Sequence, residues 1–121
     1  MFGKPGVAYV YVSYGTHHCM NVVAHVPHVA GAVLLRGAEP LLGLAQDARS
    51  LAGPGRLGRA FGLTTADTGM DLVRSALHLR AGAPSPHGRV MRSTRIGIAK
   101  SASSSALWRF SIADSPSVSR P

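Results

Sequence analysis

The sequence predicts a single α+β domain in which one mixed, curved β-sheet carries peripheral helices. Short apolar, β-branched runs separated by Gly and Pro fill the first 36 residues, as is typical of strands. Two later segments begin behind a proline and carry apolar residues at helical spacing. The chain has 121 residues, which corresponds to one domain, and 45% hydrophobic residues are enough for a core.

The first predicted strand, Val7–Tyr14, contains all the tyrosines of the chain. Because side chains alternate along a strand, Tyr9 and Tyr11 share one face and the valines between and after them share the other. Tyr14 precedes Gly15, where the strand must turn, so its ring is expected to project from a loop tip. An aromatic face beside an aromatic tip suits a flat ligand and a wedge next to it.

Two further strands are predicted at Cys19–Ala24 and Ala32–Arg36, with a hairpin loop at His25–Gly31 between them. Their composition predicts a sheet that is buried on one face. The remaining β runs are predicted later in the chain, at Arg89–Ile98 and Ala106–Ile112.

A helix is predicted over Leu41–Leu51, because Pro40 is tolerated in a first turn and leucines recur along the segment. A second helix follows Pro54 and ends at Gly62, which suits a helix C-terminus. The other segments are expected to be a loop with capping residues, a short helix or strand reaching Leu79, a turn-rich connector and a polar loop. The loop, connector and polar loop are Thr65–Asp71, 81–87 and Ser101–Ser105.

The charge is strongly positive, with 13 Lys and Arg against 5 Asp and Glu, a net charge of +8. Eleven of the thirteen cations are Arg, which binds phosphate in a bidentate manner, so a nucleic acid is the expected partner. A GC-rich coding sequence is the alternative explanation of an Ala-, Gly- and Arg-rich chain. No apolar run approaches 18 residues and no signal peptide is evident, so no membrane association is expected.

The lone Cys19 has no internal disulfide partner, which predicts a reducing compartment such as the bacterial cytoplasm. Cys19 adjoins His17 and His18, and His25 and His28 follow, so these residues are candidate zinc ligands. Neighbouring residues on a strand face opposite ways and no second cysteine exists, so no metal site is predicted.

Seven segments follow one another from Met1 to Arg120: MFGKPGVAYVYVSYG, CMNVV, AVLLRGAEP, GPGRL, RIGI, WRF and VSR. In sequence and in order they resemble the methylpurine (3-methyladenine) DNA glycosylase family. The resemblance implies a monomeric enzyme that needs no cofactor and acts on double-stranded DNA containing damaged purines. Such enzymes extrude the target base and hold it by stacking and hydrogen bonds.

The resemblance also implies roles for individual residues. In the base pocket, Tyr11 stacks on the flipped base, Leu34 forms an apolar wall, and Asn21 disfavours the exocyclic amino group of guanine. Tyr14 enters the minor groove and fills the gap that the nucleotide leaves. Arg36, together with the backbone carbonyl of Ile96, positions the attacking water.

Each of these residues also has a plainer interpretation. The tyrosines are compatible with ordinary sheet aromatics, Asn21 with a turn cap, and Arg36 with a local ion pair to Glu39. Arg56 is a phosphate-contact candidate from the residues alone, because it sits in the first turn of a predicted helix. A solvated surface arginine is its alternative.

The general base of the family is a glutamate in an upstream motif that is not in this sequence, where Glu39 is the only glutamate. We therefore expect residues 1–121 to be the C-terminal portion of a glycosylase domain that starts at an internal methionine. The leading hypothesis is a DNA glycosylase of base-excision repair that acts on alkylated or deaminated purines, the 3-methyladenine and hypoxanthine class. The alternatives are a DNA-binding remnant without activity and a truncated product that does not fold stably.

Overall fold

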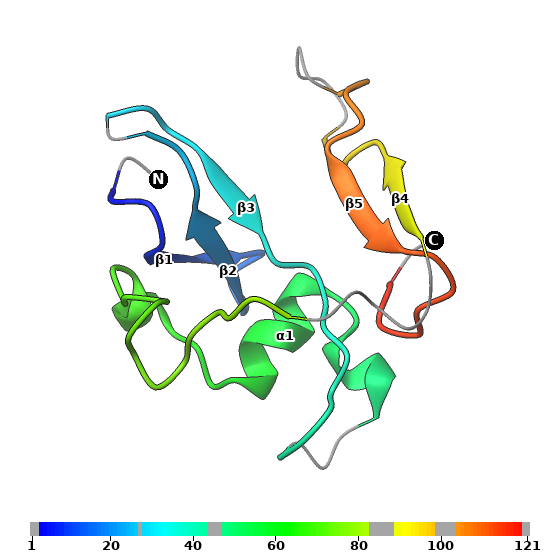
Figure 1. The fold of residues 1–121 in the computed structure, drawn as a ribbon, viewed down its shortest axis with the longest axis horizontal. Helices are drawn as coiled ribbons and strands as arrows, with labels where there is room; N and C mark the ends of the chain where they lie inside the picture. Colours follow the sequence, from blue (N-terminus) through cyan, green and yellow to red (C-terminus); the bar gives the residue numbers. More distant parts are fainter. Residues whose placement is uncertain (1–2, 27, 44–46, 83–88, 99–103, 120–121) are drawn as a thin grey trace.

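The computed structural model describes residues 3–26, 28–43, 47–82, 89–98 and 104–119. Within these ranges the elements are β1 (Ala8–Ser13), β2 (His17–Val23), β3 (Ala32–Leu34), η1 (Ala48–Leu51), α1 (Pro54–Ala60), η2 (Thr65–Asp67), β4 (Val90–Ser93) and β5 (Arg109–Ile112). The two η elements are short 3-10 helices. The predicted α+β class is confirmed (Figure 1).

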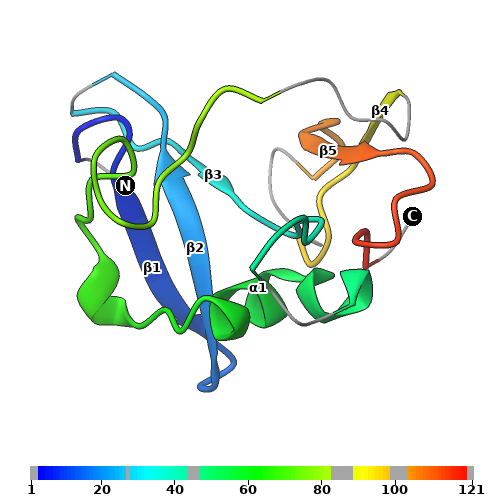
Figure 2. The same cartoon turned by 60° about the horizontal axis from the view of Figure 1, so that its bottom comes forward.

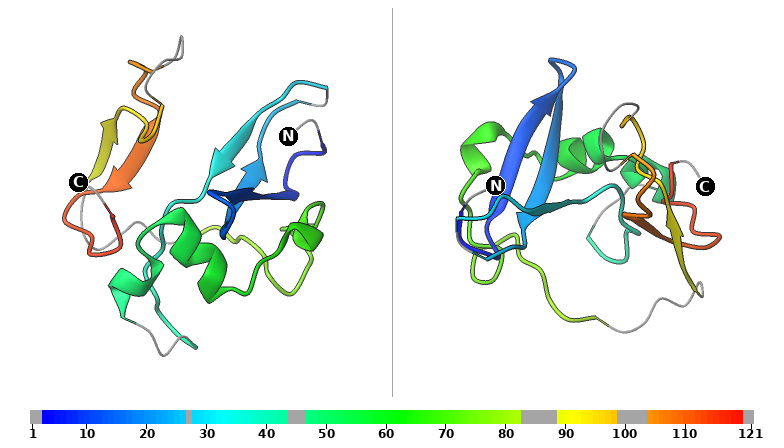
Figure 3. Two further views of the ribbon diagram at one scale, coloured as in Figure 1. Left: turned by 180° about the vertical axis from the view of Figure 1, so that it is seen from behind. Right: turned by 90° about the horizontal axis from the view of Figure 1, so that it is seen from above.

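The described strands form two antiparallel sheets, so the prediction of one mixed sheet is wrong. One sheet has the order β1-β2-β3 and the other pairs β4 with β5. Figures 1 and 3 show the β4–β5 pair standing beside the three-stranded sheet, not continuous with it. Each pairing joins strands that follow one another in the chain, β1 with β2, β2 with β3 and β4 with β5, and all three are antiparallel.

The β1–β2 hairpin closes through a tight turn at Tyr14 and Gly15. Both residues have positive φ, 50° and 73°, and the Thr16 N–H donates to the Ser13 carbonyl at 3.3 Å. Positive φ at both central residues suits the right-handed twist of paired strands. β2 therefore begins at His17, two residues before the predicted start, while its central part is as predicted.

The core lies on one face of the three-stranded sheet. Ala8 and Val10 of β1 and Met20 of β2 are buried there against Leu63 and Leu72 from the following segments. Val22 and Leu35 pack around this cluster. Removing each large aliphatic side chain from water contributes about 1.5–3 kcal/mol, so this face supplies much of the stability. The prediction of a sheet buried on one face is too simple, because β2 is buried on its other face as well, at Cys19, Asn21 and Val23.

The outer edge of β1 is covered by the chain that follows η2. Ala8 donates to the Met70 carbonyl at 2.9 Å, and Gly69 donates back to the Ala8 carbonyl at 2.8 Å. The Thr68 hydroxyl accepts from Val10 N–H at 3.0 Å. The edge strand thus has partners for its backbone groups, which protects it from pairing with another chain.

Helix α1 forms where the sequence predicts it and packs directly on β2 (Figure 2). Pro54 is in its first turn, and Gly62, with φ 64°, follows its end. Gly58 makes the close approach possible, because a Cβ there would collide with the carbonyl oxygen of His18. The helix therefore lies backbone to backbone against the central strand of the sheet.

Several predicted elements are shorter than expected. The helix predicted over Leu41–Leu51 is wrong for the residues that the structure describes: Leu41 and Leu42 are exposed, the chain bends at Leu42 and Gly43, where φ is 80°, and helical structure is described only in the short helix η1. Residues 44–46 lie outside the described residues. A positive φ is unavailable inside a helix, so Gly43 interrupts the predicted segment.

The later β runs are also shorter than predicted. Arg89–Ile98 forms a strand only over β4, because the chain turns at Ile96 and Gly97, where φ is 78°. Ala106–Ile112 is a strand only over β5. The segment to Leu79 is neither helix nor strand. Thr65–Asp71 does carry the predicted caps, with a capping box at η2; most of 81–87 and of Ser101–Ser105 lies outside the described residues.

The segment after β5 returns to the three-stranded sheet. The Ser115 hydroxyl donates to a carboxylate oxygen of Glu39 at 2.6 Å. A Cβ on Gly37 would lie 2.5 Å from the Ser117 carbonyl oxygen, so glycine allows this close packing. These contacts hold the C-terminal segment beside the chain that leaves β3. None of the described helices is long and apolar enough to cross a membrane.

Candidate functional site

The strand register gathers the predicted pocket residues on the face of the sheet opposite the core. Tyr9 of β1, Asn21 of β2 and Leu34 of β3 are directly paired across the three strands. In the next row Tyr11 is paired with Cys19. Paired residues in an antiparallel sheet point to the same face, so these five side chains form one surface, called the tyrosine face below.

Stacking and a hydrogen bond fix the side chains at the centre of the tyrosine face. The rings of Tyr9 and Tyr11 are stacked with centroids 6.0 Å apart and an interplanar angle of 28°. Asn21 is 7% exposed, and its amide nitrogen donates to the Tyr9 carbonyl oxygen at 3.3 Å. Asn21 lies inside β2, so the turn-cap interpretation is wrong. Its side chain is a rigid, buried polar group beside two aromatic rings.

Arg36 lies two residues beyond β3, next to the tyrosine face. Its carbonyl accepts from Gly53 N–H at 2.8 Å, and the following Gly37 forms a bridge with Ala52. The side chain is half-buried and close enough to Tyr11 and Cys19 for its charge to act on both. The roles predicted for Arg36, water positioning or a phosphate contact, stay predictions.

Burial keeps the polar groups of this face in their neutral forms. Burial is the largest cause raising the pKa of Tyr11 above its ordinary value, and the hydrogen-bonded Cys19 raises it further, while Arg36 acts in the opposite direction. Burial likewise raises the pKa of the Cys19 thiol, against the lowering effects of Tyr11 and Arg36. Near neutral pH, Tyr11 is a phenol and Cys19 a thiol, so the face offers hydrogen-bond donors and no anion.

Tyr14 projects from the hairpin tip beside this face. Its side chain is 94% exposed, and its φ of 50° directs the turn away from the strands. The sequence-based prediction of an exposed ring at a loop tip is confirmed. A large apolar ring held in water on a rigid hairpin is available to insert into a partner.

Arg56 lies in the first turn of α1, and its guanidinium bends back over η1. Nη1 donates to the Arg49 carbonyl at 3.1 Å, and the side chain is exposed. Arg56 and Tyr14 line one hollow of about 690 Å³, which Arg49, His17 and the segment from Ser115 to Ser119 also line. The two residues predicted to touch DNA therefore share one surface.

Ile96 lies in the turn after β4 and is half-buried. The water-positioning pair of Arg36 and Ile96 stays a prediction.

The histidines do not assemble into a metal centre in the described part of the chain, where no three His, Cys, Asp or Glu side chains are grouped suitably. His17 and His18 follow each other on β2, one exposed and one half-buried, as alternation along a strand requires.

Sequence reasoning missed three contributors to this region. Cys19 is the cross-strand neighbour of Tyr11. The ring of Tyr9 stacks on that of Tyr11, although the sequence indicated only a structural role for Tyr9. Arg49 lines the hollow beside Tyr14. Working out the hairpin register from the turn at Gly15 reveals the Tyr11–Cys19 pair, whereas the position of Arg49 depends on the packing of η1 against α1.

Comparison with known proteins decides the family. The profile of the Methylpurine-DNA glycosylase (MPG) family matches residues 1–116. The chain belongs to this family. Similar proteins include one from Myxococcus xanthus, 50% identical over 98 residues, and one from Rhodopseudomonas palustris CGA009, 44% identical over 132 residues. Each is named "Putative 3-methyladenine DNA glycosylase".

The match covers the relatives only in part. The Myxococcus alignment covers 81% of this chain and 50% of the relative, and the Rhodopseudomonas alignment covers 100% and 61%. A relative from Anaeromyxobacter dehalogenans, 44% identical, is covered over 57% of its length. The chain thus spans about half to two-thirds of the length of these methylpurine-DNA glycosylase relatives.

Proposed function

We propose that the protein acts as a DNA glycosylase of base-excision repair on alkylated or deaminated purines, the 3-methyladenine and hypoxanthine class. The observation that carries the proposal is the meeting of Tyr11, Asn21, Leu34 and Arg36 on one face, with the exposed Tyr14 at the adjoining tip. Family membership supports the alkylated-purine part of this proposal, since the relatives are named for 3-methyladenine.

The geometry suits a base that has been turned out of the duplex. Tyr14 fills the gap in the stack, which is how apolar wedges hold minor-groove kinks open. The extruded purine lies against Tyr11, whose ring is already held by Tyr9, and stacking contributes about 1–3 kcal/mol per base. The rigid amide of Asn21 and the wall of Leu34 then select among purines.

In this scheme Arg36 places a positive charge next to the flipped nucleotide. Cleavage of an N-glycosidic bond develops positive charge on the sugar and needs an oriented water. The Gly53 N–H fixes the backbone of Arg36, and the half-buried guanidinium that this backbone carries can hold that water, or the phosphate next to the flipped nucleotide. The Ile96 carbonyl is the second group proposed for the water.

The test is release of free base from a duplex. The purified protein is incubated with DNA containing 3-methyladenine or hypoxanthine, and released base is quantified by chromatography. We expect release that falls at least tenfold in Tyr11→Ala, because about 1.4 kcal/mol of lost stacking corresponds to tenfold. No release of either base contradicts the catalytic proposal.

A second function, lesion-DNA binding without base release, is favoured by the positions of the carboxylates. Glu39 accepts from Ser115, while Asp47, Asp67 and Asp71 accept hydrogen bonds from nearby backbone N–H groups. None of these four lies in the register rows of the tyrosine face, so none is placed as a general base there. Salt-sensitive duplex binding together with the absence of release is the expected result for this second function.

That residues 1–121 form the C-terminal portion of a glycosylase domain stays a prediction. The intact mass of the protein from its native cells tests it. A mass near 12.6 kDa corresponds to the sequence as printed. A substantially larger mass brings an upstream glutamate back into consideration as the general base.

A further inference from the structure

The hollow beside Tyr14 contains arginines that the base-binding scheme does not use. It lies between the β1–β2 hairpin tip, η1, the start of α1 and the C-terminal segment, and has a volume of about 690 Å³. Its polar lining includes Ser13, Tyr14, His17, Arg49, Arg56, Ser115 and Ser119, and Cys19 of the tyrosine face also lines it. None of the described residues that line it is acidic, whereas two are arginines.

The Arg56 guanidinium is held next to the backbone of Arg49 by the fold, and both residues line the hollow. Arg56 reaches back to the Arg49 carbonyl, which joins the first turn of α1 to the last turn of η1. The ring of His17 meets the backbone at Gly55, where a Cβ would lie 2.8 Å from it. The hairpin, η1 and α1 are thereby fixed around the hollow, so its charges do not have to be assembled when a partner arrives.

We propose that this hollow binds the phosphodiester backbone of the DNA strand beside the wedge, with Arg49 as a phosphate-binding residue alongside Arg56. This inference rests on the proposed function, because it takes Tyr14 as the group that enters the duplex. Phosphates border every nucleotide, so a ring inserted in the minor groove brings backbone phosphates next to the groups around the ring. Arginine is suited to them because its planar guanidinium binds phosphate in a bidentate manner.

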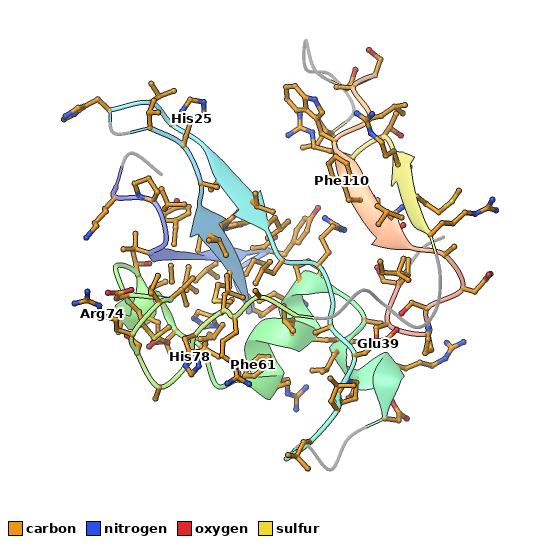
Figure 4. All side chains as sticks on the ribbon, in the orientation of Figure 1. His25, Glu39, Phe61, Arg74, His78 and Phe110 are labelled. Atoms are coloured by element: carbon orange, nitrogen blue, oxygen red, sulfur yellow. The ribbon has the colours of Figure 1, made fainter. Side chains whose placement is uncertain are left out.

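Arg49→Gln is the cleanest variant for the test. The recorded hydrogen bonds of Arg49 use its backbone carbonyl, which accepts from Arg56 and from Ala52 N–H, and glutamine keeps both. Arg74→Gln is the matched control, because it removes the same charge from another exposed arginine. Glu39 marks the position of the hollow in Figure 4, because it is hydrogen-bonded to Ser115, which lines the hollow. Figure 4 shows Arg74 at the left edge of the molecule, away from Glu39.

The measurement is duplex binding by fluorescence anisotropy from 50 to 300 mM KCl, with hypoxanthine-containing and undamaged DNA. For Arg49→Gln we expect affinity about three- to tenfold lower on both duplexes and a slope of log K against log salt shallower by about 0.9. Arg49→Lys is expected to restore most of the slope, and Arg74→Gln to keep the wild-type slope.

Equal slopes for Arg49→Gln and Arg74→Gln overturn the proposal. An effect of Arg49→Gln on the hypoxanthine duplex alone also overturns it, because a backbone contact acts on both duplexes alike. Absence of duplex binding by the wild-type protein is a different result, since it removes the proposed function itself. Thermal unfolding of each variant by circular dichroism shows that the compared proteins are folded.

Discussion

At the scale of single residues, Tyr14 carries the sharpest expectation. Its ring is 94% exposed and makes no contribution to the core, so Tyr14→Ala should leave the free energy of unfolding within about 0.5 kcal/mol of wild type. Loss of the wedge should weaken binding to hypoxanthine-containing duplex by about tenfold, as expected for a lost aromatic–base contact. Anisotropy titrations check this, with Tyr14→Phe as the control that keeps the ring. Equal affinity of the Ala variant and wild type contradicts the assigned role.

Because of Tyr11 and Cys19, we expect the free energy of unfolding to decrease at alkaline pH. Both pKa values are raised above their ordinary values of 10.0 and 9.0, so the folded protein holds these protons more tightly than the unfolded chain. Their contribution is complete below about pH 8 and is lost as the pH rises through 9 and 10 towards the folded-state pKa values. Urea unfolding at pH 7.5 and pH 10 should show this loss.

Cys19→Ala separates the two contributions to this pH dependence. The variant removes the thiol proton and the neighbour that raises the pKa of Tyr11. We therefore expect a smaller decrease in the free energy of unfolding between pH 7.5 and pH 10 than in wild type. An unchanged pH dependence shows that the alkaline loss arises elsewhere in the chain.

At the scale of elements, α1 depends on the absence of a side chain at Gly58. Alanine normally stabilises a helix interior by about 1 kcal/mol relative to glycine. Here the added Cβ collides with the backbone of β2, and such overpacking costs about 1–3 kcal/mol. We expect Gly58→Ala to lower the free energy of unfolding, measured by urea titration. Gly82→Ala is the control, because its Cβ meets nothing within 4 Å.

The elements also show how far local sequence signals reach. The first hairpin and α1 follow from composition, because Gly15 ends one strand and Pro54 and Gly62 bound the helix. The helix predicted over Leu41–Leu51 fails, because Leu41 and Leu42 remain exposed to water while Leu51 is buried, so the leucines do not share one buried helix face. Whether an apolar run is buried depends on tertiary packing, which propensity does not contain.

Some residues of the candidate site are positioned by local sequence, and others by tertiary contacts. Tyr11 and Tyr14 belong to one strand and its turn, so the sequence places them correctly. Arg36 reaches the tyrosine face only because Gly53 and Gly37 fix the chain after β3. The hydrogen bond from Gly53 N–H to the Arg36 carbonyl joins different segments of the chain, and no hydrophobic periodicity indicates it. The family resemblance, not the pattern of the residues, singled out Arg36, and its role stays a prediction.

At the scale of the whole molecule, the β4–β5 pair exposes a large apolar surface. Trp108 and Phe110 are 60% and 61% exposed, with Arg95 and Arg92 over their rings at 5.4 Å. Figure 4 shows Phe110 on β5, within this separate sheet. Exposed aromatics of this extent are uncommon in monomeric proteins and add to the risk of association.

Trp108, the only tryptophan, reports on this surface in the 121-residue protein. We expect its fluorescence to have a solvent-exposed emission maximum and to be quenched readily by acrylamide. A cooperative thermal transition by circular dichroism should accompany it if the core of the three-stranded sheet folds as described. A blue-shifted, poorly quenched emission means that Trp108 is covered, and absence of a cooperative transition means that the chain does not fold stably.

The central claim is that this protein turns a damaged purine out of the duplex, with Tyr14 as wedge and Tyr11 as platform. The most direct test places 2-aminopurine next to hypoxanthine in a duplex and follows its fluorescence as protein is added, which requires no base release. The account predicts a rise in fluorescence with wild type, and little or none with Tyr14→Ala or with undamaged DNA. No rise with wild type, or an equal rise with Tyr14→Ala, contradicts it.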